Sequence, residues 1–230
     1  MPRRTRNGTR FSGRREVAIG LGVYALYLLA SRRKRDERGR ARAAANAERV
    51  VAFERRLGIH VEPRLQASLL PHRRLLAVLN VAYVFSNAAL TVGWLMRLYG
   101  KRRPEFHRFR RAAVLTTLIA QPVFVLFPCA PPRSLDGFVD TMSDVTGVDL
   151  DSGFMAQLYD PLAAMPSIHV AYAVVTAAGV AAASESPMLR AAAPAYPPLV
   201  AAVIFVTANH YVLDAVAGAA VAAIALRLAR

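Results

Sequence analysis

Five apolar segments of about twenty residues dominate this sequence of 230 residues, and they limit the folds that it can adopt. The segments cover residues 75–98, 112–130, 163–183, 189–208 and 211–229. An α-helix rises about 1.5 Å per residue, so about 20 apolar residues cross the hydrocarbon core of a bilayer. A sixth segment, residues 17–30, is shorter. We therefore expect an all-α polytopic membrane protein built as a six-helix transmembrane bundle.

The N-terminal quarter of the chain is harder to assign. Residues 17–30 follow a basic stretch, a combination that a signal peptide also shows. Ser31 and the RRKR run behind it make a poor cleavage site, which favours an uncleaved anchor. Residues 41–70 mix apolar and charged side chains, a pattern typical of an amphipathic helix at the membrane interface. A connector packed on the bundle is the alternative.

The net charge of +15 fits either a nucleic-acid binder or a membrane protein with basic cytoplasmic loops. Apolar stretches separate most of the basic runs and leave little polar surface for nucleic acid, so we expect no nucleic-acid partner. The very basic segment 97–111 predicts a cytoplasmic loop. Residues 131–162 hold six Asp and only one basic residue, Arg133, which predicts an outer loop. If residues 17–30 span the membrane, the basic stretch 32–42 falls on the outer side, where we expect it to bind anionic headgroups. The alternative is that residues 17–30 do not span.

Ionisable residues within membrane segments are costly and usually functional. Three stand at the predicted outer ends of helices: His169 in AMPSIHVAYA, and His210 with Asp214 in NHYVLDAVAG. His210 and Asp214 are four residues apart, so on a helix they share a face and the carboxylate can orient the imidazole. A hydrogen bond to a neighbouring helix is the plainer interpretation of either histidine. Zinc is a further alternative, but the sequence has no HExxH motif and no clear third ligand.

Two more residues are candidates for binding a phosphate at the same face. Ser167, after Pro166, resembles the start of a helix, where backbone N–H groups can hold a phosphate oxygen. Arg133 offers a guanidinium for a phosphate, although it could simply offset the aspartates of its loop. The single Cys129 excludes an internal disulfide and gives no sign of a cysteine metal site.

Together these motifs resemble a known family. PSIH followed about forty residues later by HYVLD is similar to the paired histidine motifs of the type 2 phosphatidic acid phosphatase superfamily. The segments AMPSIHVAYA, NHYVLDAVAG and FPCAPPRSLDGFVDT resemble the branch that includes inositol phosphorylceramide synthase and its bacterial relatives, which are inositolphosphotransferase-like. The likeness covers roughly residues 50–225. It implies a six-helix bundle and a phosphohistidine mechanism without metal or cofactor.

The resemblance also implies a role for each candidate residue. His210 attacks phosphorus, Asp214 orients it, and His169 protonates the leaving oxygen and then activates the acceptor. Ser167 and Arg133 hold the phosphoryl oxygens. The sequence departs from the simple phosphatases, because their KxxxxxxRP motif has only a poor counterpart at Arg97 to Arg103–Pro104, on the predicted cytoplasmic loop. An arginine that those enzymes carry six residues before the second histidine is replaced by Ile204.

These observations predict a lipid-phosphate phosphatase or phosphotransferase in the cytoplasmic membrane of a bacterium, with its active site on the outer face. Its partners are then a lipid phosphate or phospholipid substrate and the surrounding membrane lipids. The predicted organisation is a basic cytoplasmic tail (1–16), a first membrane segment with an interfacial connector (17–74), and a catalytic transmembrane domain (75–230). The alternative is a transporter or channel that uses His and Asp as a proton relay.

Overall fold

The computed structural model describes residues 11–32, 36–151 and 159–230. Most of these residues are helical, and among them there is no β-strand, only an isolated bridge between Cys129 and Ala163. The all-α class expected from the sequence is therefore confirmed. The helices are α1 (Gly13–Arg32), α2 (Glu37–Leu57), α3 (Glu62–Leu69), α4 (Arg73–Gly100), α5 (Glu105–Leu126), η1 (Pro132–Ser134), α6 (Thr141–Thr146), α8 (Ile168–Ala183), α9 (Pro187–Ala192), η2 (Ala193–Ala195), α10 (Tyr196–Val206) and α11 (Val212–Leu228).

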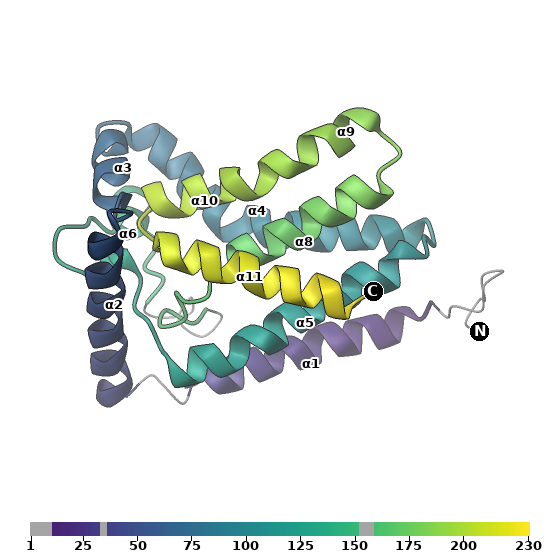
Figure 1. The fold of residues 1–230 in the computed structure, drawn as a ribbon, viewed down its shortest axis with the longest axis horizontal. Coiled ribbons are helices and arrows are strands. Elements are labelled where there is room, and N and C mark those ends of the chain that lie inside the picture. Colours follow the sequence, from purple (N-terminus) through teal and green to yellow (C-terminus); the bar gives the residue numbers. More distant parts are fainter. Residues whose placement is uncertain (1–10, 33–35, 152–158) are drawn as a thin grey trace.

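Helix α8 is the centre of the bundle, because α4, α5, α10 and α11 all pack against it (Figure 1). Helix α1 lies along α5. Helices α2, α3 and α6 gather at one end of the bundle, where the connection between α10 and α11 also lies. Helix α1 begins and helix α11 ends toward the opposite end.

The close approach of α8 and α11 depends on small side chains. Helix α8 buries Ala171 and Ala173, and α11 buries Gly218 and Ala222. Inside a bilayer no water drives helices together, and small residues stabilise their packing by letting the backbones approach closely. Gly218 is the tightest point, since a Cβ atom built on it would lie 2.2 Å from the carbonyl oxygen of Ser167.

We expect Gly218→Ala to lower stability by about 1–3 kcal/mol, because the new methyl group must push Ser167 or α11 away. The matched control is Gly93→Ala, since a Cβ atom on this helical glycine would meet nothing within 4 Å. Thermal unfolding of the detergent-solubilised variants measures the difference. A Gly218→Ala protein as stable as the Gly93→Ala protein would contradict the packing argument.

Two helical stretches of the described chain are long and apolar enough to cross a membrane, namely α5 and the continuous run Pro187–Val206. A third span results if α4, bent by 46° between Arg73–Phe85 and Ala89–Gly100, counts as one. The described surface also exposes large apolar side chains, among them Phe85, Met96, Leu126, Leu199 and Val216. These features support membrane association. The complete six-helix transmembrane arrangement stays a prediction.

Helix α2 begins at Glu37, before the segment 41–70 that the sequence placed at the membrane interface, and covers its first part. Its Val50 and Val51 are buried with Ala43 and Ala47 in a cluster that includes Cys129, Ala130, Leu162 and Tyr211. Phe53 and Leu57 remain 50% and 54% exposed. One apolar face of α2 therefore covers the bundle end, and its interfacial position in a membrane stays a prediction.

Candidate active site

His210 lies in the connection between α10 and α11 and is only 2% exposed. Its Nδ1 atom is 2.8 Å from the carbonyl oxygen of Ala164 and 3.2 Å from Oδ2 of Asp214. A carbonyl and a carboxylate can only accept, so the proton of a neutral imidazole must be on Nδ1. Burial lowers the pKa of His210 to about 4, which keeps the ring neutral near pH 7. The Nε2 atom therefore presents a free lone pair.

Asp214 is fixed in the first turn of α11 and is completely buried. Its Oδ2 atom accepts the backbone N–H of Tyr211 at 3.0 Å as well as facing His210. This capping-box arrangement satisfies a donor at the start of the helix, and a carboxylate is favoured at that position by the helix dipole. The carboxylate cannot rotate away from His210 without giving up this cap.

His169 comes from the first turn of the neighbouring helix α8 and faces His210. Its Nδ1 atom lies 3.3 Å from Nε2 of His210. The ring of His169 stacks on Tyr83 of α4, with 4.4 Å between the ring centroids. The imidazole of His169 on α8 thus meets that of His210, in the connection before α11, at the atom that carries the lone pair. This geometry lets one ring act as nucleophile while the other transfers protons.

Ser167 connects α8 to α11. It is the N-cap of α8, with Oγ accepting the backbone N–H of Val170 at 3.3 Å. Its own N–H donates to the carbonyl oxygen of Asp214 at 2.9 Å. This second hydrogen bond joins the first turn of α11 to the start of α8, and His169 and Asp214 both reach His210 from there.

Arg133, on η1, is 5% exposed and bonds to the connection between α10 and α11. Its backbone N–H donates to Ala208, and its Nε donates to Oδ1 of Asn209 at 3.0 Å. The two terminal nitrogens donate to the two oxygens of Asp151 at 3.0 and 2.8 Å. Two parallel bonds of this kind are also how a guanidinium holds a phosphate. In this structure a carboxylate therefore takes the place that the sequence predicted for a phosphate.

All five residues predicted for the site thus lie at one end of the bundle. Sequence reasoning missed Tyr83, Asn209 and Asp151. Asn209 could have been noticed as a polar residue beside His210 in an apolar run. The pairing of Arg133 with Asp151 agrees with the alternative that Arg133 offsets the aspartates of its loop. Tyr83 gave no signal, because it is far from both histidines along the chain. Arg97 and Arg103 pair with Glu185 and Glu105 near the far ends of α4 and α8, away from the histidines.

The fold and this cluster define an all-α, membrane-associated protein in which two histidines face each other and a buried carboxylate contacts one of them. More particularly, the chain belongs to the PAP2 superfamily, whose model matches residues 48–228. Members of this superfamily are phosphoesterases or phosphotransferases, which supports hydrolysis or transfer of a phosphate ester by this chain. No significant match was found among curated proteins or solved structures.

Proposed function

We propose that the chain transfers a phosphate-bearing group from a membrane lipid through a phosphohistidine formed on His210. The observation that carries the proposal is the placement of the two ring nitrogens of His210. Two acceptors hold its Nδ1 proton, so the Nε2 lone pair faces His169 across 3.3 Å. A neutral imidazole oriented by a carboxylate is a competent nucleophile at neutral pH.

In the first half-reaction Nε2 of His210 forms a bond to phosphorus, and the bond between phosphorus and the leaving oxygen breaks. Protonated His169 gives its proton to that oxygen. The carboxylate of Asp214 stabilises the positive charge that develops on the imidazole of His210. In the second half-reaction neutral His169 takes a proton from the acceptor hydroxyl, whose oxygen attacks phosphorus and releases His210.

The guanidinium of Arg133 is the proposed partner of the phosphoryl oxygens. It already stands beside Asn209 and His210, and the substrate phosphate exchanges with Asp151 as its bidentate partner. Ser167 and the first N–H groups of α8 supply further donors near the same place. Catalysis of this kind rests on position and charge stabilisation, and the scheme uses no metal at the histidines.

The proposed substrates are phospholipids, and the proposed reaction is transfer of an inositolphosphoryl-like group rather than simple hydrolysis. The likeness of the APPR segment around Arg133 to the inositol phosphorylceramide synthase branch supports this choice, as does the absence from the sequence of the phosphatases' KxxxxxxRP motif. The exposed apolar side chains support a lipid environment. The acidic loop 131–162 supports an active site on the outer face of a bacterial cytoplasmic membrane.

A substrate panel tests the proposal. Purified protein is incubated with phosphatidic acid, polyprenyl diphosphate or phosphatidylinositol, with and without ceramide-like or polyol acceptors. We expect a new phosphate-containing lipid that forms only when donor and acceptor are both present. Free phosphate from any donor without acceptor would identify a hydrolase instead. Intact lipids throughout, or equal product from a His210→Ala protein, would contradict the phosphohistidine proposal.

A further inference from the structure

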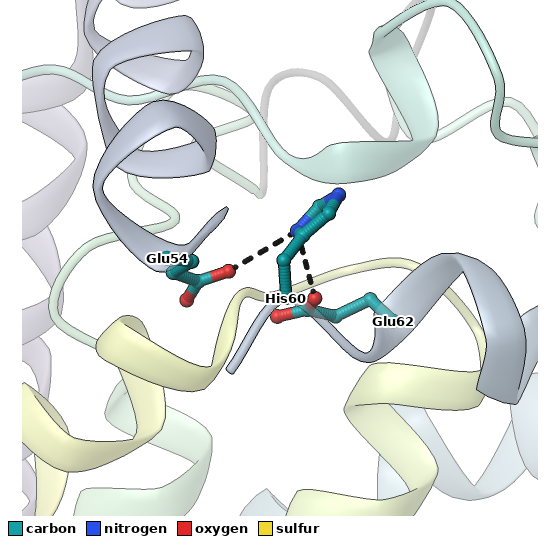
Figure 2. A group of neighbouring side chains, drawn as sticks. All are labelled: Glu54, His60 and Glu62. Atoms are coloured by element: carbon teal, nitrogen blue, oxygen red, sulfur yellow. Dashed lines mark hydrogen bonds and ion pairs between the residues drawn. The ribbon is translucent and has the colours of Figure 1, made fainter. Parts of the chain in front are cut away.

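A second cluster of ionisable side chains lies where α2 passes into α3, outside the proposed active site. Glu54 is in the last turns of α2, His60 is in the connection, and Glu62 is the first residue of α3. Figure 2 shows the imidazole of His60 facing both carboxylates. Its Nδ1 atom is 3.4 Å from Oε2 of Glu54 and 3.1 Å from Oε2 of Glu62. The side chains of both glutamates are 0% exposed, and that of His60 is 10% exposed.

The other oxygen of each carboxylate is already committed to helix α11. Oε1 of Glu54 accepts the backbone N–H of Leu213 at 2.7 Å, and Oε1 of Glu62 accepts that of Val212 at 2.7 Å. These contacts fix the orientation of both carboxylates and leave their Oε2 atoms beside His60. Carboxylates that bind metal ions are commonly held in this way, with their position set by a hydrogen bond.

Hydrogen bonds from His60 alone do not satisfy both carboxylates of the cluster. Nδ1 of His60 carries at most one proton, so it cannot serve both carboxylates well at once. Oε2 of Glu62 is buried, and among the described residues it makes no hydrogen bond of good geometry, although Nδ1 of His60 lies 3.1 Å from it. Asp214 adds a third completely buried carboxylate on α11. Buried carboxylates are costly unless a cation or donor compensates them or a proton neutralises them, so this arrangement favours a cation or a proton at Oε2.

We propose that Glu54, His60 and Glu62 bind a divalent transition-metal ion, with Zn²⁺ as the first choice. The ligand atoms are the Oε2 atoms of the two glutamates and Nδ1 of His60. Zinc in a tetrahedral site holds such ligands at about 2.0–2.2 Å, so neighbouring ligand atoms lie about 3.3–3.5 Å apart. The two measured separations are close to this value, and all three ligand atoms lie within 4.8 Å of one another. Two carboxylates also balance the charge of the ion.

The ion has a structural consequence for the neighbouring helix. It fixes the two carboxylates that hold Val212 and Leu213, and thereby the first turn of α11 in which Asp214 lies. The ion takes no part in the phosphohistidine chemistry, which the proposed mechanism assigns to His169 and His210. The metal site therefore stands or falls independently of the proposed reaction.

Metal content measures the site directly. The protein is purified through a tag without histidine, stripped with a chelator, dialysed against Zn²⁺ and analysed by mass spectrometry of the metal. We expect about one Zn²⁺ per chain for the wild type, for His210→Ala and for the exposed control His72→Ala. His60→Ala should bind more than about 100-fold more weakly, because loss of a ligand exceeds the effect of losing an outer contact.

A second variant and a spectroscopic measurement separate the loss of a metal ligand from misfolding. Glu62→Gln keeps an acceptor for the N–H of Val212 but loses the anionic ligand, and it should also lose zinc. Co²⁺ bound to the wild type should show visible d–d absorption, which is absent in both variants. A wild type without stoichiometric metal would overturn the proposal and leave a shared proton as the occupant. Unchanged zinc binding in folded His60→Ala would likewise overturn it.

Discussion

Replacing His210 by alanine is expected to lower kcat/KM by about 10⁴-fold or more, the scale seen when a covalent nucleophile is removed. The loss corresponds to about 5.5 kcal/mol of transition-state stabilisation. The reason is the geometry of its ring, in which Nδ1 is held by Ala164 and Asp214 and Nε2 faces His169. Alanine removes the atom that bonds to phosphorus, and no rearrangement of the facing imidazole replaces it.

The measurement is turnover of the best donor found in the substrate panel, together with trapping of a labelled phosphoprotein by rapid quenching in base. The wild type and the control His72→Ala should give a base-stable, acid-labile label, whereas His210→Ala should give none. His72 is an exposed histidine that makes no side-chain capping bond at the start of α4, so it controls for the change of residue type. Turnover in His210→Ala within tenfold of the wild type would rule out His210 as the nucleophile.

Asp214→Asn is expected to lower turnover by about 10²–10⁴-fold while expression and thermal stability stay near those of the wild type. Asparagine keeps a side-chain oxygen that can accept the N–H of Tyr211, so the cap of α11 survives. What it loses is the negative charge beside Nδ1 of His210 at 3.2 Å. Without that charge the imidazole is less nucleophilic, and the amide group can favour the wrong tautomer.

A pre-steady-state experiment separates this positioning role from a structural one. Formation of the phosphoprotein should slow by the same factor as turnover, with little change in KM, because the carboxylate acts on the nucleophile rather than on substrate binding. Asp144→Asn is the matched control, since Asp144 is exposed on α6. An Asp214→Asn protein with normal turnover, or one that fails to fold while activity per folded molecule is unchanged, would exclude the proposed role.

Much of the fold was predictable, because the apolar segments of the sequence are long and strongly patterned. The segments expected at 75–98 and 211–229 correspond to α4 and α11 within a few residues. The segment expected at 163–183 begins as a helix only at Ile168. There Ser167 caps α8, as its position after Pro166 predicted, and the residues before it form turns and bends instead. Local capping chemistry therefore decided a boundary that hydropathy alone placed too early.

The candidate site was only partly predictable. The spacing of four residues between His210 and Asp214 is a local property, so helix geometry anticipates their contact. The contact of His169 with His210 depends on the packing of α8 against α11, and this packing requires Gly218 to lie against Ser167. The composition of the loop indicated an aspartate as partner of Arg133, but only the folding of the loop decides that Asp151 is the one that holds it.

By itself, the sequence determined the all-α class, the paired histidine motifs and the membership of the PAP2 superfamily, because these follow from local spacing and composition. Only the tertiary structure decided which atoms meet. It brought Glu54 and Glu62 of α2 and α3 onto the first turn of α11, across about 150 residues of chain. Contacts between residues so distant in sequence depend on how helices pack, and packing is set by the shapes of all the side chains together.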